Sequence, residues 1–303
     1  MHSREINMTE IHFNAPVKLE DIKFDVTLDR QRNPLPQDVQ QRVDTAFNAF
    51  ADKAEAKSGK RPTKGQNCVL ANYRAMPNGL EGVCKIATFD EVLYFARSQI
   101  PGQDYEFGRK QVGFPIASWG VLLSNDNQLL FARKRGAEGA YEGSPYSAFG
   151  TLVSADKDIE KERISPGKLL ERSVAGEAGK AIWERRKAIN YLGLNVYDEN
   201  SAKVNNGYDT VWEIAVDAGM EEIMALLEEN PQFEAKSKAS PVIASPERLT
   251  DFAAAYPTTT SGLSGIFNYI GSKFGHIELL NQYARYMQAM GTEARDLKFC
   301  PVR

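Results

Sequence analysis

The sequence has little histidine and little cysteine, three residues of each in 303. The histidines are His2, His12 and His276, and the cysteines are Cys68, Cys84 and Cys300. The cysteines form no CxxC pair and have no histidine near them in sequence, so their spacing disfavours a zinc site of the usual Cys/His type. A Ser-His-Asp triad would have to recruit one of the scattered histidines. We expect the cysteines to be small buried residues or surface thiols in a reducing compartment.

Long apolar runs and an excess of one charge are also missing. No stretch approaches the ~20 apolar residues of a membrane helix, and the start of the sequence lacks the apolar core of a signal peptide. With 37 basic against 40 acidic residues, the formal net charge is −3, which gives no reason to expect nucleic acid as the main partner. The sequence therefore predicts a cytoplasmic protein with no membrane segment and no nucleic-acid partner.

Residues 1–112 show α/β patterns but no motif to which chemistry can be assigned. In residues 37–57, apolar side chains recur at spacings of three and four, which predicts an amphipathic helix. Apolar runs at 67–76 and 82–86 flank Pro77-Asn78-Gly79 and predict a hairpin, while Thr88 and Glu91 have capping-box spacing before a short helix. This N-terminal extension could cover one side of a ligand pocket, contribute to substrate choice or build a homodimer interface.

Residues 113–256 combine short strands with amphipathic helices. The predicted order is a hairpin (116–123 and 128–133), a glycine-bearing loop (136–150), one long helix (about 167–186), strands at 190–197 and 209–217, and helices at 220–229 and 245–255. Residues 257–303 are predicted to form a C-terminal helical segment, with a loop at 257–265 and a helix at 275–290. The fold class expected from this succession is α/β (α+β).

The long predicted helix carries the segment most suggestive of chemistry. Its central run is Arg172-Ser173-Val174-Ala175-Gly176-Glu177-Ala178-Gly179. This run and the surrounding elements resemble a Nudix domain, in which a glycine and an acidic residue precede the run Arg-Glu-aliphatic-any-Glu-Glu-any-Gly. Gly150 occupies the place of the leading glycine, and Asp156 falls where the family's first glutamate would be. Ser173 and Gly176 replace two of the three helical carboxylates.

The resemblance implies both a fold and an activity. The implied fold is a mixed-sheet α/β/α sandwich over residues 113–256, preceded by the N-terminal extension and followed by the C-terminal helices. The implied activity is hydrolysis of a nucleoside diphosphate linked to another group. In such a site, carboxylates on one helix face hold Mg²⁺ or Mn²⁺, which neutralises the diphosphate and activates a water molecule.

Three interpretations of the residues follow, and the sequence leaves them open. If the protein is a hydrolase, the candidate catalytic residues are Glu177, Arg172 and Ser173, and the metal ligands are Glu177, Asp156 and Glu213, with Asp158 and Glu160 as further loop carboxylates. Ser173 could hold a metal-bound water but could not act as its general base. The missing carboxylates make this metal site impaired or rearranged.

In the second interpretation, the domain binds a nucleotide-like or diphosphate-bearing small molecule without cleaving it, as a sensor or assembly module. Arg133 and Arg135 would then bind phosphate, and Gly150 and Phe149 would line the ligand. Stacking surfaces would come from Trp119, Tyr141, Tyr146 or Phe149. In the third interpretation the function is unrelated, with a different chemistry on the same scaffold or on another fold. Each residue also has a structural alternative: Arg172 pairs with a loop, Glu177 is a solvated helix residue and the tryptophans are core residues.

Overall fold

The computed structural model describes residues 9–32, 34–96, 100–133, 146–198, 206–230, 241–291 and 297–302. It shows an α/β protein built on a mixed sheet, as the sequence predicts. The strands are β1 (Thr9–Lys18), β2 (Lys23–Asp29), β3 (Gln66–Met76), β4 (Gly79–Thr88), β5 (Phe114–Leu123), β6 (Leu129–Arg133), β7 (Tyr146–Ser147), β8 (Ile159–Glu160), β9 (Arg163–Ile164), β10 (Arg186–Tyr197), β11 (Gly207–Val216), β12 (Val242–Ala244) and β13 (Leu297–Pro301).

The helices are distributed over both halves of the chain. They are α1 (Gln37–Ser58), α2 (Phe89–Phe95), α3 (Gly102–Phe107), the π-helix η1 (Gly108–Val112), α4 (Pro166–Glu177), α5 (Lys180–Glu184), α6 (Met220–Glu228), the 3₁₀-helix η2 (Pro246–Arg248), α8 (Leu249–Ala255), α9 (Thr260–Phe274) and α10 (His276–Met290). Within the described residues, none of these helices combines the length and apolar character needed to cross a membrane.

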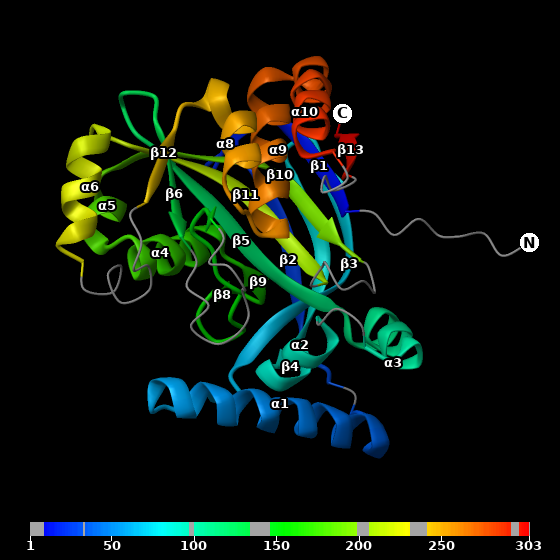
Figure 1. The fold of residues 1–303 in the computed structure, drawn as a ribbon. Helices are drawn as coiled ribbons and strands as arrows, with labels where there is room; N and C mark the ends of the chain where they lie inside the picture. Colours follow the sequence, from blue (N-terminus) through cyan, green and yellow to red (C-terminus); the bar gives the residue numbers. More distant parts are fainter. Residues whose placement is uncertain are drawn as a thin grey trace, which may run out of the picture.

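One continuous sheet joins distant parts of the sequence (Figure 1). Its strand order is β13-β1-β10-β11-β5-β3-β4-β2-β9-β8, with β6 adding to β5 and carrying β7 and β12. β1 runs parallel to β13 and antiparallel to β10, and β11 runs parallel to β5. Strands from residues 1–112, 113–256 and 257–303 therefore hydrogen-bond within the same sheet.

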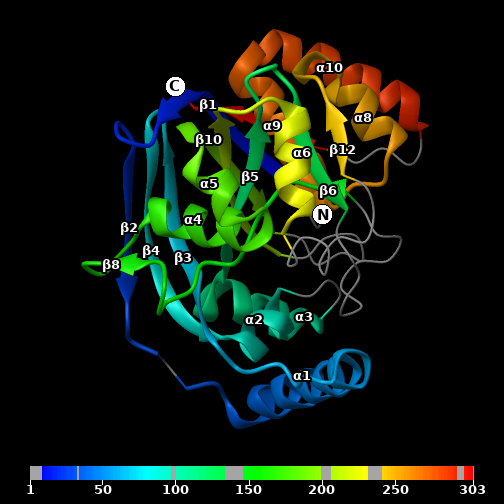
Figure 2. The same ribbon diagram turned by 90° about the vertical axis from the view of Figure 1, so that its left-hand side faces the viewer.

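Two layers of helices cover opposite faces of the central strands (Figures 1 and 2). On one face, Trp119 and Val211 share a buried cluster with residues of α8, α9 and α10. On the other face, Trp212 and Ile214 share a buried cluster with residues of α4, α5 and α6. Alternation of side chains along β11 thus divides the domain into an α/β/α arrangement.

The N-terminal part continues the sheet and curls it. Val26 of β2 lies in the same buried cluster as Leu194 of β10, although β11, β5, β3 and β4 separate these strands in the sheet order. A further cluster joins Val43 of α1 to Phe95 of α2 and Phe114 at the start of β5. Residues 1–112 therefore pack into the structure through apolar contacts, and α1 lies at the end of the molecule seen lowest in Figure 1.

Several local predictions are confirmed. α1 matches the helix expected from apolar spacing and ends at Gly59, whose φ of 70° suits glycine. β3 and β4 form the predicted hairpin, and β5 and β6 form the second one. Thr88 and Glu91 form the capping box that opens α2.

Two predictions about helices are wrong. The helix expected over residues 167–186 is two helices, because Gly179 adopts a φ of 108° between α4 and α5. The segment 257–265, expected to be a loop, contains the start of α9. Small residues let α9 approach the sheet: a Cβ on Gly265 would lie 2.3 Å from Cε2 of Trp119. Buried Asn268 and Ser272 of α9 hydrogen-bond to the sheet. The apolar periodicity that marks a helix is therefore weak in this segment.

Candidate functional site

Gly150 and the end of α4 lie together beside β5. Phe149 and Gly120 exchange backbone hydrogen bonds, and a Cβ on Gly150 would lie 2.3 Å from the Ser118 carbonyl oxygen. The Gly150 N–H donates to Oε2 of Glu177 at 3.4 Å. The structure therefore brings together the leading glycine and the surviving glutamate of the motif, and it explains why a side chain is not accommodated at Gly150.

Arg172 ties α4 to the loop that precedes it. Its Nε donates to Oδ1 of Asp158 at 2.9 Å, and its Nη2 donates to Oδ2 of Asp158 and to the Leu152 carbonyl. A further bond joins Nη1 to Thr151 at 3.2 Å. Asp158 is fully buried and also accepts from the Ser154 N–H at 2.7 Å. Arg172 therefore has the structural role considered from the sequence, with Asp158 as its loop partner.

Ser173 and Phe149 are core residues. Ser173 is buried on the inner side of α4 next to Leu170 and Val174, and its hydroxyl has no hydrogen-bond partner among the described residues. Phe149 is 1% exposed and belongs to the cluster around Trp212. Neither side chain is placed to meet a ligand from solvent, so the predicted roles of Ser173 in catalysis and of Phe149 in ligand contact do not fit these positions.

Glu213 is engaged on the other side of the sheet from α4. Its carboxylate accepts from Asn190 at 2.9 Å, from the Tyr269 hydroxyl at 2.9 Å and from Lys273 at 3.0 Å. Tyr269 and Lys273 belong to α9, whereas the neighbours Trp212 and Ile214 face α4. Burial, together with the charge of Glu213, raises the pKa of Tyr269. Glu213 therefore stabilises the α9 layer, and this position gives no support to the prediction that it shares a metal ion with Glu177.

Asp156 does not complete a metal site either. It is exposed in the turn that precedes β8, while Glu177 is half-buried beside Gly150. Among the described residues, Glu177, Asp156 and Glu213 do not form a group of three whose ligand atoms all lie within 4.8 Å of one another. Mg²⁺ and Mn²⁺ favour several oxygen ligands around one ion. The donor set predicted from the sequence therefore does not fit the ion that the resemblance implies.

The predicted phosphate-binding residues lie at and beyond the end of β6. Arg133 is the last residue of β6, and its backbone pairs with Tyr146 of β7. Arg135 and Tyr141 lie outside the described residues. Of the predicted stacking residues, Trp119 is buried in the core, whereas Tyr146 is partly buried and packs edge-to-face against Phe252 and Tyr256.

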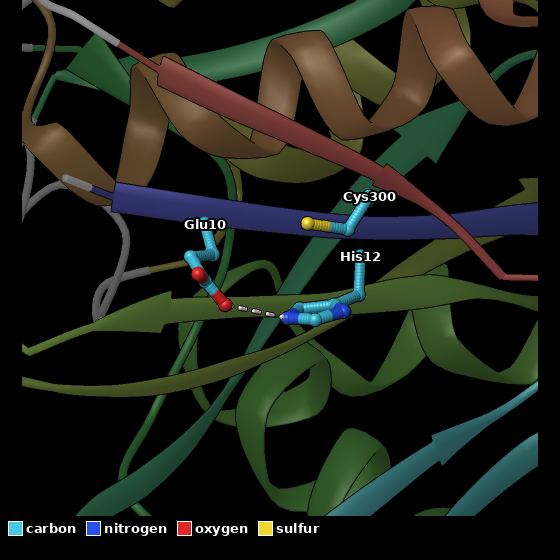
Figure 3. A group of neighbouring side chains, drawn as sticks. All are labelled: Glu10, His12 and Cys300. Carbon is cyan, nitrogen blue, oxygen red and sulfur yellow. Dashed lines mark hydrogen bonds and ion pairs between the residues drawn. The ribbon is translucent and has the colours of Figure 1, made fainter.

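A different group of possible metal ligands lies at the β1–β13 edge of the sheet (Figure 3). Within the described part of the chain, Glu10, His12 and Cys300 form the group whose ligand atoms all lie within 4.8 Å of one another. Sequence reasoning missed this group because Cys300 and His12 stand near opposite ends of the chain. The signal that was available, an alternation placing Glu10 and His12 on one strand face, gives no hint of a distant cysteine.

The electrostatics of this group reflect partial burial and one neighbouring lysine. Burial lowers the pKa of His12, and the nearby Glu10 opposes this only in part. Burial alone would raise the pKa of Glu10, but its hydrogen bond to Lys298 and the charges of Lys298 and His12 outweigh it, so this pKa is lowered. Burial and the charge of Glu10 raise the pKa of Cys300.

Comparisons with known proteins give no family for the chain. No protein-family model matches the sequence, and no curated protein matches it. A solved structure, DR0079 from Deinococcus radiodurans, aligns with 50% of this chain and 81% of its own chain, at 14% identity and a TM-score of 0.35. A likeness this distant supports neither a family nor an activity.

Proposed function

We propose that this protein is a Nudix-like module that binds a nucleotide-like or diphosphate-bearing small molecule and does not hydrolyse it through a carboxylate-bound metal. The proposal rests first on which parts of the motif have a physical role here. Gly150 allows its loop to approach the Ser118 backbone, and Arg172 binds the same loop to α4. Gly179, with its positive φ, separates α4 from α5. The parts of the motif that shape the loop and helix are therefore retained.

The observation that carries the proposal is the state of the carboxylates. Glu213 accepts hydrogen bonds from Asn190 of β10 and from Tyr269 and Lys273 of α9. Asp158 pairs with Arg172. Ser173 and Gly176 supply no carboxylate. Glu177, which accepts from the Gly150 N–H, belongs to no group of three possible metal ligands among the described residues. A single carboxylate binds Mg²⁺ weakly, because this ion loses its water reluctantly and prefers several oxygen ligands.

Ligand binding in this proposal uses the arginines at and beyond the end of β6. Arg133 and Arg135 would supply the positive charge for phosphate oxygens, since a guanidinium can donate two parallel hydrogen bonds to them. The predicted small-molecule partner, the absence of a nucleic-acid partner and a homodimer built on residues 1–112 remain predictions. We also propose a cytoplasmic location, which the three free thiols of Cys68, Cys84 and Cys300 support.

The experiment is a titration of the full chain with inorganic diphosphate, ADP and a sugar-linked nucleoside diphosphate, with and without Mg²⁺ or Mn²⁺. We expect heat of binding without turnover, and the same affinity in Glu177→Gln as in wild type. Metal-dependent turnover that Glu177→Gln abolishes would overturn the proposal and establish the hydrolase alternative.

A second set of variants locates the ligand. Replacing both arginines in Arg133→Ala/Arg135→Ala should weaken diphosphate binding at least about tenfold, because each charge-assisted hydrogen bond contributes about 1.5–3 kcal/mol. The control is Lys187→Ala, an exposed basic residue on β10. Equal affinity in all three proteins would show that the ligand site is elsewhere.

A further inference from the structure

Side chains from the two ends of the chain meet on one face of the sheet edge (Figure 3). Glu10 and His12 come from β1, and Cys300 comes from β13. The distance from His12 Nε2 to Glu10 Oε2 is 3.2 Å, and each of the three residues has a ligand atom within 4.8 Å of those of the other two. A carboxylate, an imidazole and a thiol thus point toward a common space.

Strand register explains this meeting. β1 and β13 are parallel, with His12 opposite Cys300 and Glu10 opposite Lys298. Since side chains alternate along a strand, Glu10 and His12 project from the same face, and the intervening Ile11 is buried in the α9 cluster on the other face. Neighbouring strands lie about 4.8 Å apart, which brings the side chains of paired residues into contact. The register of the two strands therefore places the three residues next to one another on one face.

Further contacts hold the two strands in this register. The Val302 N–H donates to the Phe13 carbonyl at 2.9 Å, and Asn268 of α9 donates to the His12 carbonyl at 3.1 Å. At the start of β13, the Leu297 N–H donates to the Tyr283 hydroxyl at 3.0 Å. The first bond joins the two strands, and the other two attach them to α9 and α10, so the backbone that carries the three donors is held at several points.

Two neighbours orient the donors. Lys298 donates to Oε1 of Glu10, which leaves Oε2 directed at His12. Tyr73 packs edge-on against the His12 ring, with ring centroids 6.2 Å apart. The side chains of Glu10 and His12 are 30% and 18% exposed, so an ion could reach them from solvent. Outer contacts of this kind fix ligand orientation in metal sites.

We propose that Glu10, His12 and Cys300 bind a divalent transition-metal ion of the zinc class. Zinc takes thiolate sulfur at about 2.3 Å and imidazole nitrogen or carboxylate oxygen at about 2.0–2.2 Å in a tetrahedron. Two such nitrogen and oxygen ligands are about 3.3 Å apart, close to the 3.2 Å between His12 Nε2 and Glu10 Oε2. The ion would replace the hydrogen bond between them and draw the Cys300 sulfur in by a small rotation.

The donor types select the ion. Thiolate and imidazole favour zinc and its neighbours, whereas Mg²⁺ and Ca²⁺ favour oxygen ligands. Three protein ligands leave one tetrahedral position for water or for a group from solution, as in zinc sites that are not fully closed. This site lies on the β1–β13 edge, is made of other residues than the Gly150–α4 region, and does not depend on the proposed ligand-binding function.

The test is a titration of the tag-free full chain with Co²⁺ and then Zn²⁺. We expect one Co²⁺ per chain and the charge-transfer absorption of a cobalt–thiolate bond, which Zn²⁺ then displaces. Cys300→Ser should lose this absorption, and Cys300→Ser and Glu10→Gln should each weaken zinc binding at least about tenfold, the loss seen when even an outer partner of a metal ligand is removed. Exposed His276, which is outside the group, provides the control His276→Ala, expected to bind as wild type does.

Fold integrity is checked by circular dichroism and thermal unfolding without metal. If Cys300→Ser does not fold, Glu10→Gln carries the same comparison, since its amide is similar in shape to the carboxylate. No Co²⁺ or Zn²⁺ binding by folded wild-type protein would overturn the proposal. Binding of equal strength in wild type, Cys300→Ser and Glu10→Gln would also overturn it, because the ion would then be held by other residues.

Discussion

Carboxylates behave differently in two regions of the molecule. Around α4, Asp158 is held by Arg172 and Glu177 accepts from the Gly150 N–H, while Glu213 is held by basic and polar partners on the other side of the sheet. At the β1–β13 edge, Glu10 shares a small space with His12 and Cys300. The α4 region has a sequence motif, but its predicted metal ligands do not form a group. The β1–β13 edge has no sequence motif, but three possible metal ligands lie close together there.

The difference shows what a local motif can and cannot determine. Residues spaced along one helix share a face, but whether other ligands join them depends on which strands lie alongside. In the α4 region, β11 directs Glu213 away from the motif helix. In the edge region, parallel pairing of β1 with β13 joins residues from opposite ends of the chain. Four predictions test this contrast.

The largest effect is expected for Arg172→Ala. The substitution leaves Asp158 buried with a charge and without its guanidinium partner, so the free energy of unfolding should fall by about 3 kcal/mol. Urea unfolding of Arg172→Ala, Asp158→Ala and the double variant measures the coupling between the two residues. The control is Arg185→Ala, whose exposed pair with Glu222 should contribute under about 1 kcal/mol. Equal effects for both arginines would contradict a structural role specific to Arg172.

The second-largest effect is the stabilisation of the β1–β13 edge by zinc, which should be nearly as large as the loss expected for Arg172→Ala. At free zinc 100 times above its dissociation constant, binding adds about 2.7 kcal/mol to the stability of the state that binds it. We therefore expect about 100-fold slower amide hydrogen exchange in β13 when exchange needs release of this strand. Amides of α4 should change less. Equal protection of α4 and β13, persisting in Cys300→Ser, would remove the proposed contrast between the regions.

Glu213→Ala should reduce stability by about 2 kcal/mol, because Asn190, Tyr269 and Lys273 lose their acceptor in a buried position. Urea unfolding measures this loss. The same variant should leave Mn²⁺ binding, followed by electron paramagnetic resonance, unchanged. Glu184→Ala removes an exposed i,i+4 pair with Lys180 and should cost under about 0.5 kcal/mol. A specific loss of Mn²⁺ affinity in Glu213→Ala would restore Glu213 as a metal ligand.

A smaller, pH-dependent effect is expected at Asp104, a third carboxylate satisfied by a basic partner. Two hydrogen bonds of 2.7 Å from Arg42 outweigh burial and, with the Tyr94 hydroxyl, lower its pKa. A lowered folded-state pKa gives stability that is present above the unfolded value of about 3.9 and is lost as the pH falls through the folded value.

Asp104→Asn should therefore be less stable than wild type at pH 7, with a difference that narrows below about pH 4. Asp38→Asn, which alters the exposed partner of the same arginine, should show a weaker pH dependence. Urea unfolding at a series of pH values checks both variants. A difference between Asp104→Asn and wild type that grows on acidification would contradict the assigned role of Arg42.

The sequence predicted more of the fold than of the candidate site. Apolar spacing gave α1, and turn residues gave the β3–β4 and β5–β6 hairpins, because these signals are local. The start of α9 was not predicted from the sequence. Glycine, serine and asparagine lie on the side of α9 that faces the sheet, where close approach and hydrogen bonds take the place of apolar contacts.

For the site, the sequence correctly considered a loop-binding role for Arg172, but it did not identify Asp158 as the partner. The sequence predicts Glu213 as a metal ligand because it lies on a strand next to the motif helix, whereas the face on which it lies depends on α9. The Glu10, His12 and Cys300 group required knowledge of the β1–β13 register.

The most direct test of the contrast is the zinc X-ray absorption spectrum of the protein loaded with one equivalent of Zn²⁺. If the ion binds at the β1–β13 edge, the first shell contains one sulfur at about 2.3 Å together with nitrogen and oxygen ligands at about 2.0–2.2 Å. A first shell made only of nitrogen and oxygen would place the ion away from Cys300 and would contradict the account.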